Sequence, residues 1–530
     1  MAGILSLGLA TMAQVKSGVE KLENTFWTKV DYIGAFGTED WTAGWSNFNP
    51  QTTVYPATTS TKGNGNITVA TGEHLTTNTT WAKGVYKLSG WVIVDSNVTL
   101  TIAAGTVVRG VTNAAIMVKR GGKLVAEGTA SEPIVFTSFN DAGSRTDYDW
   151  GGIIICGNAP NNNGIKAQYE GIADLYYGGV NGGDAADNSG KLKYVRIEFG
   201  CLDFGNAKEV NALTLCAVGN GTTIDYVQTS YSGDDAYEFF GGTVSAKHLI
   251  AFKTEDDDFD TDNGWSGMVQ FAVALRDPQI ADSDAGRTFE SDNDATGSDA
   301  TPKTSGTFSN VTSIGPKQDD SWTQANNWQA KLEAAMYLRR NTELKIWNSL
   351  FVGTAKGLII DGTKCVQNAK DDKLQVKFTT LCSVASPLSC DTASVNKTWT
   401  PADVKTWFEG NHGTILTGSI WDCELNNPFS LTNPKFTVDP LYPTQAYPRN
   451  KSCWTDSYIT TDANLVEHAR INIQNPVGST IVCEEELEIF NSLGVLVAKG
   501  NGTIDVSSLA PGIYVAKSKN LSTVVIKSLK

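Results

Sequence analysis

Short apolar runs separated by tight turns recur along the chain from about residue 85 onward. Between Val92 and Val108 the sequence reads VIVDSNVTLTIAAGTVV, two β-rich runs divided by a turn. Similar runs at 115–118, 123–126 and 134–137 are bounded by Gly, Asn or Pro. Such short, bounded runs are typical of strands rather than helices. The pattern therefore predicts an all-β body built from many short strands.

The middle of the chain contains a repeat. Residues 225–238 align with residues 247–260, and apolar, acidic and aromatic positions match in order at an offset of 22 residues, the difference between 225 and 247. In this alignment Tyr226 is equivalent to His248. Related strands occur at 193–197, 309–313 and 345–349. A period in the low twenties without intervening helices is typical of one coil of a β-solenoid.

Two folds can contain such strands. In a solenoid, a single coil cannot bury its inner face, so stacked coils bond to one another about 4.8 Å apart and share a continuous core. A β-sandwich instead pairs its strands antiparallel and needs hairpin turns such as Asn-Gly between adjacent runs. The similarity in this chain runs from coil to coil, which favours a parallel β-helix.

Composition around this body predicts the domain limits. Residues 1–13 are mostly apolar and end with small residues at Thr11 and Ala13, which is typical of the last part of a signal peptide. Residues 14–84 are polar, and we expect an N-terminal cap or lead-in there. The β-helix is expected over 85–470.

We expect an insertion in the β-helix at about 365–455. Its five cysteines are Cys365, Cys382, Cys390, Cys423 and Cys453. Cys382 and Cys390 are close in sequence and could form a disulfide in an oxidising compartment.

One helix is expected within that insertion. Thr400 is a good cap residue, Pro401 suits the first helical position, and Asp403 is an early acid in a run that extends to Phe408. Residues 329–340 have a helix-forming composition, but we expect their second half to be a strand because the β pattern continues after them.

The charge of the chain limits its partners. There are 42 basic and 57 acidic residues, giving a net charge of −15. An acidic chain repels phosphate backbones, so nucleic acid is not an expected partner. No apolar run of about 18 residues is present in the sequence, so no transmembrane helix is predicted.

The stretch 128–138, which reads GTASEPIVFTS, followed by WGGIIICGNA at 150–159, resembles extracellular parallel β-helix proteins of the Bacteroidetes. Residues 194–200, 234–242 and 339–342 share the resemblance, which covers roughly 85–362. It implies a right-handed parallel β-helix in a secreted or surface-attached protein. It implies no particular reaction.

The tail at 471–530 is similar to the type A sorting domain of type IX secretion. The similarity rests on NPV at 475–477, LEIFNSLG at 487–494 and IDVSSLAPGIYV at 504–515. It implies a small Ig-like β-sandwich that the outer-membrane translocon recognises, followed by removal and often attachment to surface lipopolysaccharide. The residues that the resemblance assigns to the sorting signal are Gly494, Asp505, Leu509, Gly512 and Tyr514. An ordinary accessory β-domain is the alternative.

The repeat also predicts an acidic cluster. In the solenoid register the residues Asp234, Asp235 and Glu238 lie one coil from the residues Asp256, Asp257 and Asp260. Carboxylates so close repel one another unless a cation or protonation offsets their charge, and several oxygen ligands favour Ca²⁺. The alternative is a set of solvated turn residues.

An EF-hand does not explain the stretch 258–264, because Gly264 is one position late and Val269 stands where a bidentate Glu is required. A second acidic run is expected to be a surface loop; it contains Asp282, Asp284, Glu290, Asp292 and Asp294.

Aromatic and basic residues near these acids suggest possible ligand contacts. Tyr231, Tyr237 and Trp265 could stack on sugar rings. Core packing is favoured for Phe239 and Phe240. By analogy with polysaccharide lyases, three basic residues could serve as a base: Lys253, Arg276 and Arg339.

Three functions remain open. The first is a non-enzymatic, adhesin-like or glycan-binding surface protein with the translocon and a polysaccharide as partners. The second is a carbohydrate-active enzyme, either a Ca²⁺-dependent polysaccharide lyase or a glycoside hydrolase. The third is a self-assembling surface protein. The sequence contains no Gly-x-Ser-x-Gly, P-loop or His-Glu-x-x-His motif that would indicate another reaction.

Overall fold

The computed structural model describes most of the chain in two units, Met1–Tyr458 and Ile459–Lys530. The described residues are 22, 24–30, 32–164, 167–169, 171–179, 182–205, 208–283, 285–390, 399–438, 480–490, 495–509, 512–517 and 522–527.

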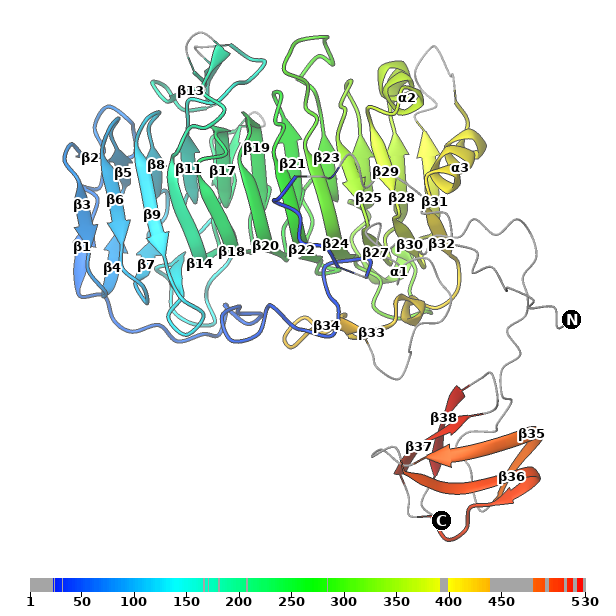
Figure 1. The fold of residues 1–530 in the computed structure, drawn as a ribbon. Coiled ribbons are helices and arrows are strands. Elements are labelled where there is room, and N and C mark those ends of the chain that lie inside the picture. Colours follow the sequence, from blue (N-terminus) through cyan, green and yellow to red (C-terminus); the bar gives the residue numbers. More distant parts are fainter. Residues whose placement is uncertain are drawn as a thin grey trace, which may run out of the picture. The chain divides into compact units, whose positions relative to one another are not determined.

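The first unit is a stack of parallel β-coils, which confirms the predicted β-helix (Figure 1). One sheet has 11 strands: β2 (Glu73–Leu75), β5 (Trp91–Val94), β8 (Ala115–Val118), β11 (Ile153–Cys156), β17 (Leu213–Val218), β19 (Tyr237–Gly242), β21 (Phe259–Asp262), β23 (Gly286–Ser291), β25 (Leu332–Leu338), β28 (Lys356–Ile360) and β31 (Ser386–Cys390). The other has 17 strands: β1 (Ser60–Lys62), β3 (Thr79–Trp81), β4 (Val85–Leu88), β6 (Thr99–Ile102), β7 (Val107–Gly110), β9 (Lys123–Glu127), β10 (Ile134–Ser138), β14 (Gly190–Glu198), β18 (Thr223–Ser230), β20 (Ser245–Phe252), β22 (Met268–Leu275), β24 (Thr307–Ile314), β26 (Lys345–Trp347), β27 (Leu350–Val352), β29 (Gln375–Lys377), β30 (Thr380–Cys382) and β32 (Thr414–Leu416).

The 22-residue register is confirmed. Strand β18 pairs in parallel with β20, with Asp225 opposite Lys247. The rings of Tyr226 and His248 stack with their centroids 4.1 Å apart. Equivalent residues of neighbouring coils therefore form columns along the stack, as the repeat predicts.

The 17-stranded sheet bends at one such column. Tyr226 and His248 have positive φ angles of 55° and 53°, and the pairing of β18 with β20 resumes on the far side of them. In the later coils the same bend separates two strands, because Asn348 (φ 53°) lies between β26 and β27. Bulky residues rarely adopt this conformation. Ring stacking along the column helps to offset its cost.

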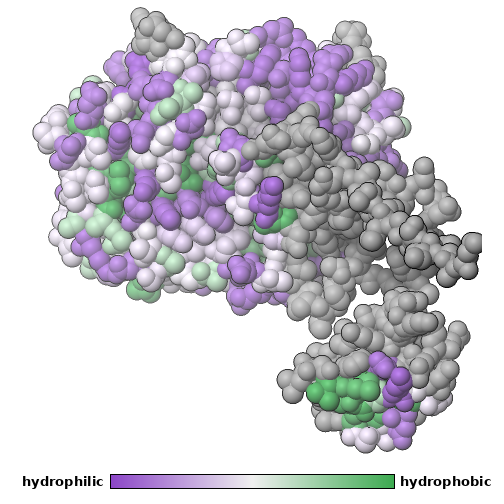
Figure 2. Space-filling view, in the orientation of Figure 1, coloured by the Kyte–Doolittle hydropathy of each residue, from purple (hydrophilic) through white to green (hydrophobic). Residues whose placement is uncertain are grey.

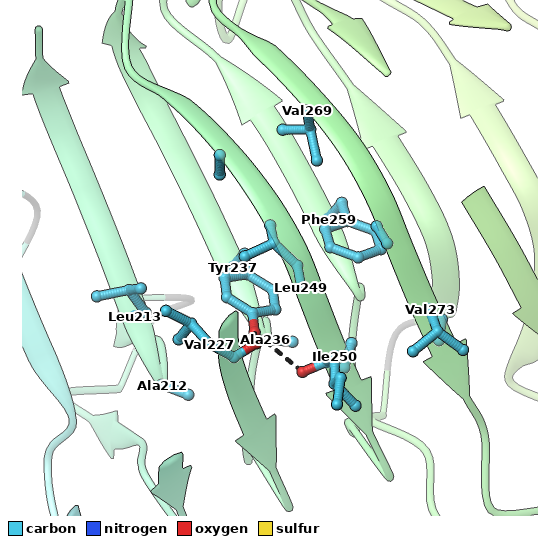
Figure 3. Packing of buried hydrophobic residues seen from close by; sticks show 14 of the residues in the cluster. Ala212, Leu213, Val227, Ala236, Tyr237, Leu249, Ile250, Phe259, Val269 and Val273 are labelled. Atoms are coloured by element: carbon cyan, nitrogen blue, oxygen red, sulfur yellow. Dashed lines mark hydrogen bonds between the residues drawn. The ribbon is translucent and has the colours of Figure 1, made fainter. Parts of the chain in front are cut away.

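Side chains that point into the stack form a continuous core. Figure 3 shows Tyr237 among apolar residues of neighbouring strands. Its hydroxyl is 2.7 Å from the carbonyl oxygen of Val227 and 2.9 Å from that of Ile250, and its single hydrogen is shared between them. The one polar atom of this ring is thereby satisfied in the interior.

The N-terminal strap, which we define as the described residues within 24–55, runs along one side of the stack (dark blue in Figure 1). The side-chain amide of Gln270 donates to Thr28 O and accepts from Thr28 N, each at 2.8 Å. Gln228 makes the same pair of bonds with Asn47, also at 2.8 Å. The ring of Trp45 packs edge-on against the rings of Tyr194 and Tyr226, with centroid distances of 5.9 and 5.8 Å. The strap thus joins coils that are not neighbours.

The limits of the stack differ from those expected. Strand β1 pairs with β4, so the parallel stack already begins within the segment expected to be a lead-in. Strands β29 to β32 also continue the stack through much of the expected insertion. The sequence pattern did not predict these coils, because β1, β29, β30 and β32 have only three residues each.

The remaining elements of the first unit are helices and small antiparallel pairs. They are α1 (Gln324–Asn327), α2 (Gly362–Lys370), α3 (Pro401–Gly410), the 3₁₀ helix η3 (Ile420–Cys423), β12 (Ala167–Gln168) with β13 (Tyr176–Tyr177), β15 (Leu202–Asp203) with β16 (Glu209–Val210), and β33 (Leu425–Asn427) with β34 (Lys435–Val438). The predicted helix after Thr400 is confirmed as α3, and Thr400 and Asp403 form a reciprocal capping box. The strand expected in the second half of 329–340 is β25.

The expected disulfide between Cys382 and Cys390 is not formed. Cys382 lies in β30 and Cys390 in β31, on different sheets. Their sulfur atoms contact different carbonyl oxygens, those of Ser419 (3.7 Å) and Trp399 (3.1 Å).

The described part of the second unit is one four-stranded antiparallel sheet. Its order is β36 (Leu496–Asp505), β35 (Thr480–Phe490), β37 (Gly512–Lys517) and β38 (Ser522–Lys527). The Ig-like sandwich stays a prediction.

Hydrophilic residues predominate on the face of the β-helix that Figure 2 shows. Among the described residues, no helix is long and apolar enough to cross a membrane.

Candidate functional site

Carboxylates from successive coils lie side by side on the outer face of the 11-stranded sheet. Glu238 of β19 is opposite Asp260 of β21, which is opposite Glu290 of β23. Because the strands are parallel and in register, the three side chains leave the sheet on the same face. The predicted stacking of acidic residues is therefore present, and it extends one coil further than the repeat indicated.

The turns before these strands contain a second ladder. The side-chain oxygen of Asn211 accepts a hydrogen bond from Asp235 N (3.0 Å), and Asp235 Oδ1 accepts from Asp257 N (2.9 Å). Asp257 Oδ1 in turn accepts from Arg287 N (2.6 Å). One oxygen of each aspartate thus supports the next coil.

Together these acids could hold a metal ion. Three groups of carboxylates have ligand atoms within 4.8 Å of one another: Asp234 with Asp235 and Asp256, Asp235 with Glu238 and Asp260, and Asp257 with Asp260 and Glu290. Asp256 Oδ1 and Asp260 Oδ1 are buried and accept no hydrogen bond from the described residues. Oxygen ligands alone suit Ca²⁺. The two unpartnered oxygens are what a bound cation would satisfy.

The acidic cavity, as we call it, has a volume of about 640 Å³ and is lined by these carboxylates. Other parts of its wall are formed by amides, two arginines and three aromatic rings, namely Asn162, Asn163, Gln168, Arg339, Arg340, Tyr169, Tyr177 and Phe240.

Burial changes the protonation of the acids. It raises the pKa values of Asp235, Asp257 and Asp260 well above the usual range, and neighbouring carboxylates raise them further. Burial is also the main reason why the pKa values of Asp262 and Glu290 rise to about 8. Desolvation disfavours the charged form of an acid. Without a cation, part of this cluster is therefore protonated at neutral pH.

Arginines offset some of the charge at one end of the cluster. Arg339 pairs with Glu290 and, through Nε, with Asp292 Oδ1 (2.8 Å). Arg340 Nη1 bonds Asp292 Oδ2 (2.7 Å). Arg287 pairs with Glu290 and lies 3.7 Å from Asp257 Oδ2. These contacts of Arg287, Arg339 and Arg340 gather on Asp257, Glu290 and Asp292.

Residues 72–418, more than half of the chain, match the pectate-lyase-like β-helix domain. The chain belongs to this family. No curated protein and no solved structure matched the chain. Membership of the pectate-lyase-like β-helix family is consistent with a carbohydrate-related function, and it explains the parallel stack.

Within this β-helix domain, Glu290 and Asp292 of the second acidic run do not lie in the expected surface loop. Glu290 and Asp292 are 7% and 5% exposed, and they belong to the acidic cavity. Asp282 lies outside β23, and Asp284 lies outside the described residues. The sequence missed the role of Glu290 because it follows Asp260 by 30 residues rather than by 22.

The proposed aromatic ligands also lie elsewhere than expected. Tyr237 and Trp265 are completely buried, and Tyr231 is 5% exposed, so none of them presents a ring to solvent for a sugar. These rings stabilise the core. The core position expected for Phe239 is confirmed. Phe240, 9% exposed, instead packs against Tyr169 and Tyr177 and lines the acidic cavity.

The three candidate bases have different surroundings. Arg276 forms a buried ion pair with Asp258, and Lys253 pairs with Asp277. Only Arg339 lines the acidic cavity.

The expected sorting residues lie in the second unit. Asp505 ends β36, and Leu509 lies in the turn that follows. Gly512 and Tyr514 lie in β37, and Gly494 lies outside the described residues.

Proposed function

We propose that the acidic cavity binds Ca²⁺ and, through it, an acidic glycan. The observation that carries this proposal is the stack of carboxylates from three successive coils, with buried oxygens of Asp256 and Asp260 that lack partners. A divalent cation can join these oxygens to a carboxylate of the ligand. Its charge would also replace the protons that the buried acids otherwise hold.

Two further features support a glycan as the ligand. The family is that of pectate-lyase-like β-helix domains. The wall of the cavity carries amide groups from Asn162, Asn163 and Gln168, which can bond sugar hydroxyls. In this proposal the protein is a secreted or cell-surface, adhesin-like glycan-binding protein. Type IX export, which the sequence of the tail supports, brings it to the cell surface.

A carbohydrate-active enzyme is the second candidate. Buried carboxyls with raised pKa values beside ionised ones are suited to general acid and base roles. Arg339 is a poor candidate for a lyase base, because Glu290 and Asp292 hold its guanidinium and raise its pKa. The binding function therefore has the stronger support.

Calorimetric titration of the chelator-treated protein with Ca²⁺ tests the cation site. We expect binding by the unchanged protein and a loss of affinity of about tenfold or more in Asp260→Asn, because a carboxylate ligand becomes a neutral amide. Binding to immobilised polygalacturonate should require Ca²⁺ and decrease in the same variant. The ultraviolet absorbance of unsaturated sugar ends, followed in the same samples, reports lyase activity.

Asp141 is exposed and does not line the acidic cavity, so Asp141→Asn is the matched control and should leave Ca²⁺ affinity unchanged. Equal Ca²⁺ affinity in Asp260→Asn and in the control would contradict the cation site. Formation of unsaturated ends that is lost in Asp260→Asn would replace the binding function with the enzymatic one.

A further inference from the structure

A second cavity, of about 720 Å³, lies beside the first residues of β25, β28 and β31. Lys331, which directly precedes β25, lines it together with Lys356 of β28 and Ser386 of β31. The loop that carries α1 forms another part of the wall and supplies Trp322 and Trp328. We call it the lysine–tryptophan cavity. It shares no lining residue with the acidic cavity.

The loop is held on both sides. The carboxylate of Asp320 accepts hydrogen bonds from Ser419 Oγ (2.6 Å) and Ile420 N (2.7 Å). On the other side, Gln329 N donates to Pro278 O at 2.8 Å. These bonds fix the walls of the cavity before any ligand binds, which lowers the entropy cost of binding.

The lining of the cavity is basic although the chain as a whole is acidic. Lys317, Lys331 and Lys356 line it with a single acid, Glu333. Lys356 Nζ pairs with Glu333 Oε1 at 2.8 Å, and Lys317 Nζ donates to Ser383 Oγ at 2.7 Å. Lys331 is exposed and makes no ion pair within the described part of the chain. An anionic group in the cavity would therefore meet a net positive charge.

A buried donor points to a ligand independently of the charge. Trp328 is only 8% exposed, lines the cavity, and its indole Nε1 has no hydrogen-bond partner among the described residues. A buried N–H without an acceptor costs about 1–3 kcal/mol. Trp322 packs against the same small apolar cluster and also lines the cavity. Indole faces bind the C–H faces of sugar rings, and an N–H at their edge can bond a ring substituent.

Hydroxyl groups complete the wall. They belong to Thr323, Thr354, Ser383, Ser386 and Thr417. Each can both donate and accept a hydrogen bond, which matches a ligand with many hydroxyls better than a simple inorganic anion. The volume lies within the usual range for small-molecule sites.

We propose that the lysine–tryptophan cavity is a binding site for a sugar residue that carries a carboxylate, a hexuronate, and that it binds without a metal ion. The lysines hold the carboxylate, the partly exposed indole of Trp322 contacts the ring, the Trp328 N–H donates to a ring substituent, and the hydroxyls bond the sugar hydroxyls. This site is separate from the acidic cavity, whose proposed binding needs a cation. Glu333 connects the two, because its Oε2 accepts from Arg287 Nε at 2.9 Å and Arg287 pairs with Glu290.

Calorimetry of the full chain in excess chelator tests this site alone, since chelation removes any cation from the acidic cavity. The probes are trimers of galacturonate, glucuronate and mannuronate, each compared with the corresponding neutral trimer. We expect at least one uronate trimer to bind and its neutral counterpart to bind at least tenfold more weakly. Lys331→Gln should lower affinity for the uronate about tenfold, because a charged hydrogen bond is lost. The residue is exposed and forms no ion pair among the described residues, so we expect the variant to fold.

Trp328→Phe keeps an aromatic ring but removes the N–H, and it should weaken binding severalfold. Lys405→Gln, an exposed lysine of α3, is the matched control and should bind as the unchanged protein does. The proposal is overturned if no uronate trimer binds, if the neutral trimer binds equally well, or if Lys331→Gln binds like the control. Ca²⁺ binding by the acidic cavity is measured separately, without chelator, so failure of one proposal is distinguishable from failure of the other.

Discussion

Individual carboxylates have two roles in the acidic cavity. In Asp235 and Asp257, one oxygen accepts a hydrogen bond from the backbone of the next coil, and each side chain also belongs to a group of close carboxylates. Replacing either one would disturb both folding and cation binding. Asp260 Oδ1 accepts no hydrogen bond from the described residues. Replacing Asp260 therefore tests the charge of the cluster without breaking the ladder of Asn211, Asp235 and Asp257.

The pKa shifts predict how stability depends on pH. The pKa values of Glu290 and Asp262 rise from 4.5 and 3.8 to about 8, chiefly because burial disfavours their charged forms. The folded protein therefore retains protons that the unfolded chain releases, and its stability falls as pH rises from about 4 to about 8. Each such group contributes about 1 kcal/mol per pH unit across this window. The melting temperature in chelator should decrease from about pH 5 to about pH 8.

Added Ca²⁺ should raise the melting temperature more at about pH 8 than at about pH 5, because the proposed cation site needs ionised carboxylates. A metal-free protein with equal melting temperatures at both pH values would show that the buried acids do not hold extra protons.

Among the elements, those that repeat regularly were the most predictable. Residues 225–260 predicted the register of β18 with β20, and with it the approach of Asp235 to Asp257. The next coils contain longer connections, and β23 therefore follows β21 at a different spacing. The contribution of Glu290 and of the arginines became visible only in the folded chain, since parallel pairing fixes the strands while the loops between them vary in length.

Helix α3 is the clearest case of an element specified by local sequence. The hydroxyl of Thr400 accepts from Asp403 N, and the carboxylate of Asp403 accepts from Thr400 N at 2.8 Å. Thr400→Ala should destabilise the helix by about 1 kcal/mol. Hydrogen exchange should show faster exchange of amides in 402–409 and unchanged rates in β18 and β20. Equal exchange of α3 in both proteins would mean that tertiary contacts, rather than the cap, hold its first turn.

For the whole molecule, the division into two units allows one of them to be removed. Tyr458 is the last residue of the unit that contains the β-helix, and we expect this unit to fold without the second one. A chain that ends at Tyr458 should therefore have the same melting temperature as the full chain, within about 2 °C. Scanning calorimetry of both chains measures this. A much lower value would show that the second unit stabilises the first.

The contacts of the strap bear on how the molecule unravels. A stack of coils with only nearest-neighbour contacts can fray inward from either end. Here Asn348 Nδ2 donates to Tyr32 O (3.0 Å), while Tyr55 reaches Glu198 at 2.9 Å. One continuous stretch of chain thus ties the coil of β14 to the coil of β26 and β27. The coils between these two points are therefore expected to open together, so forced extension should break this part of the stack in a single large event instead of a series of small steps.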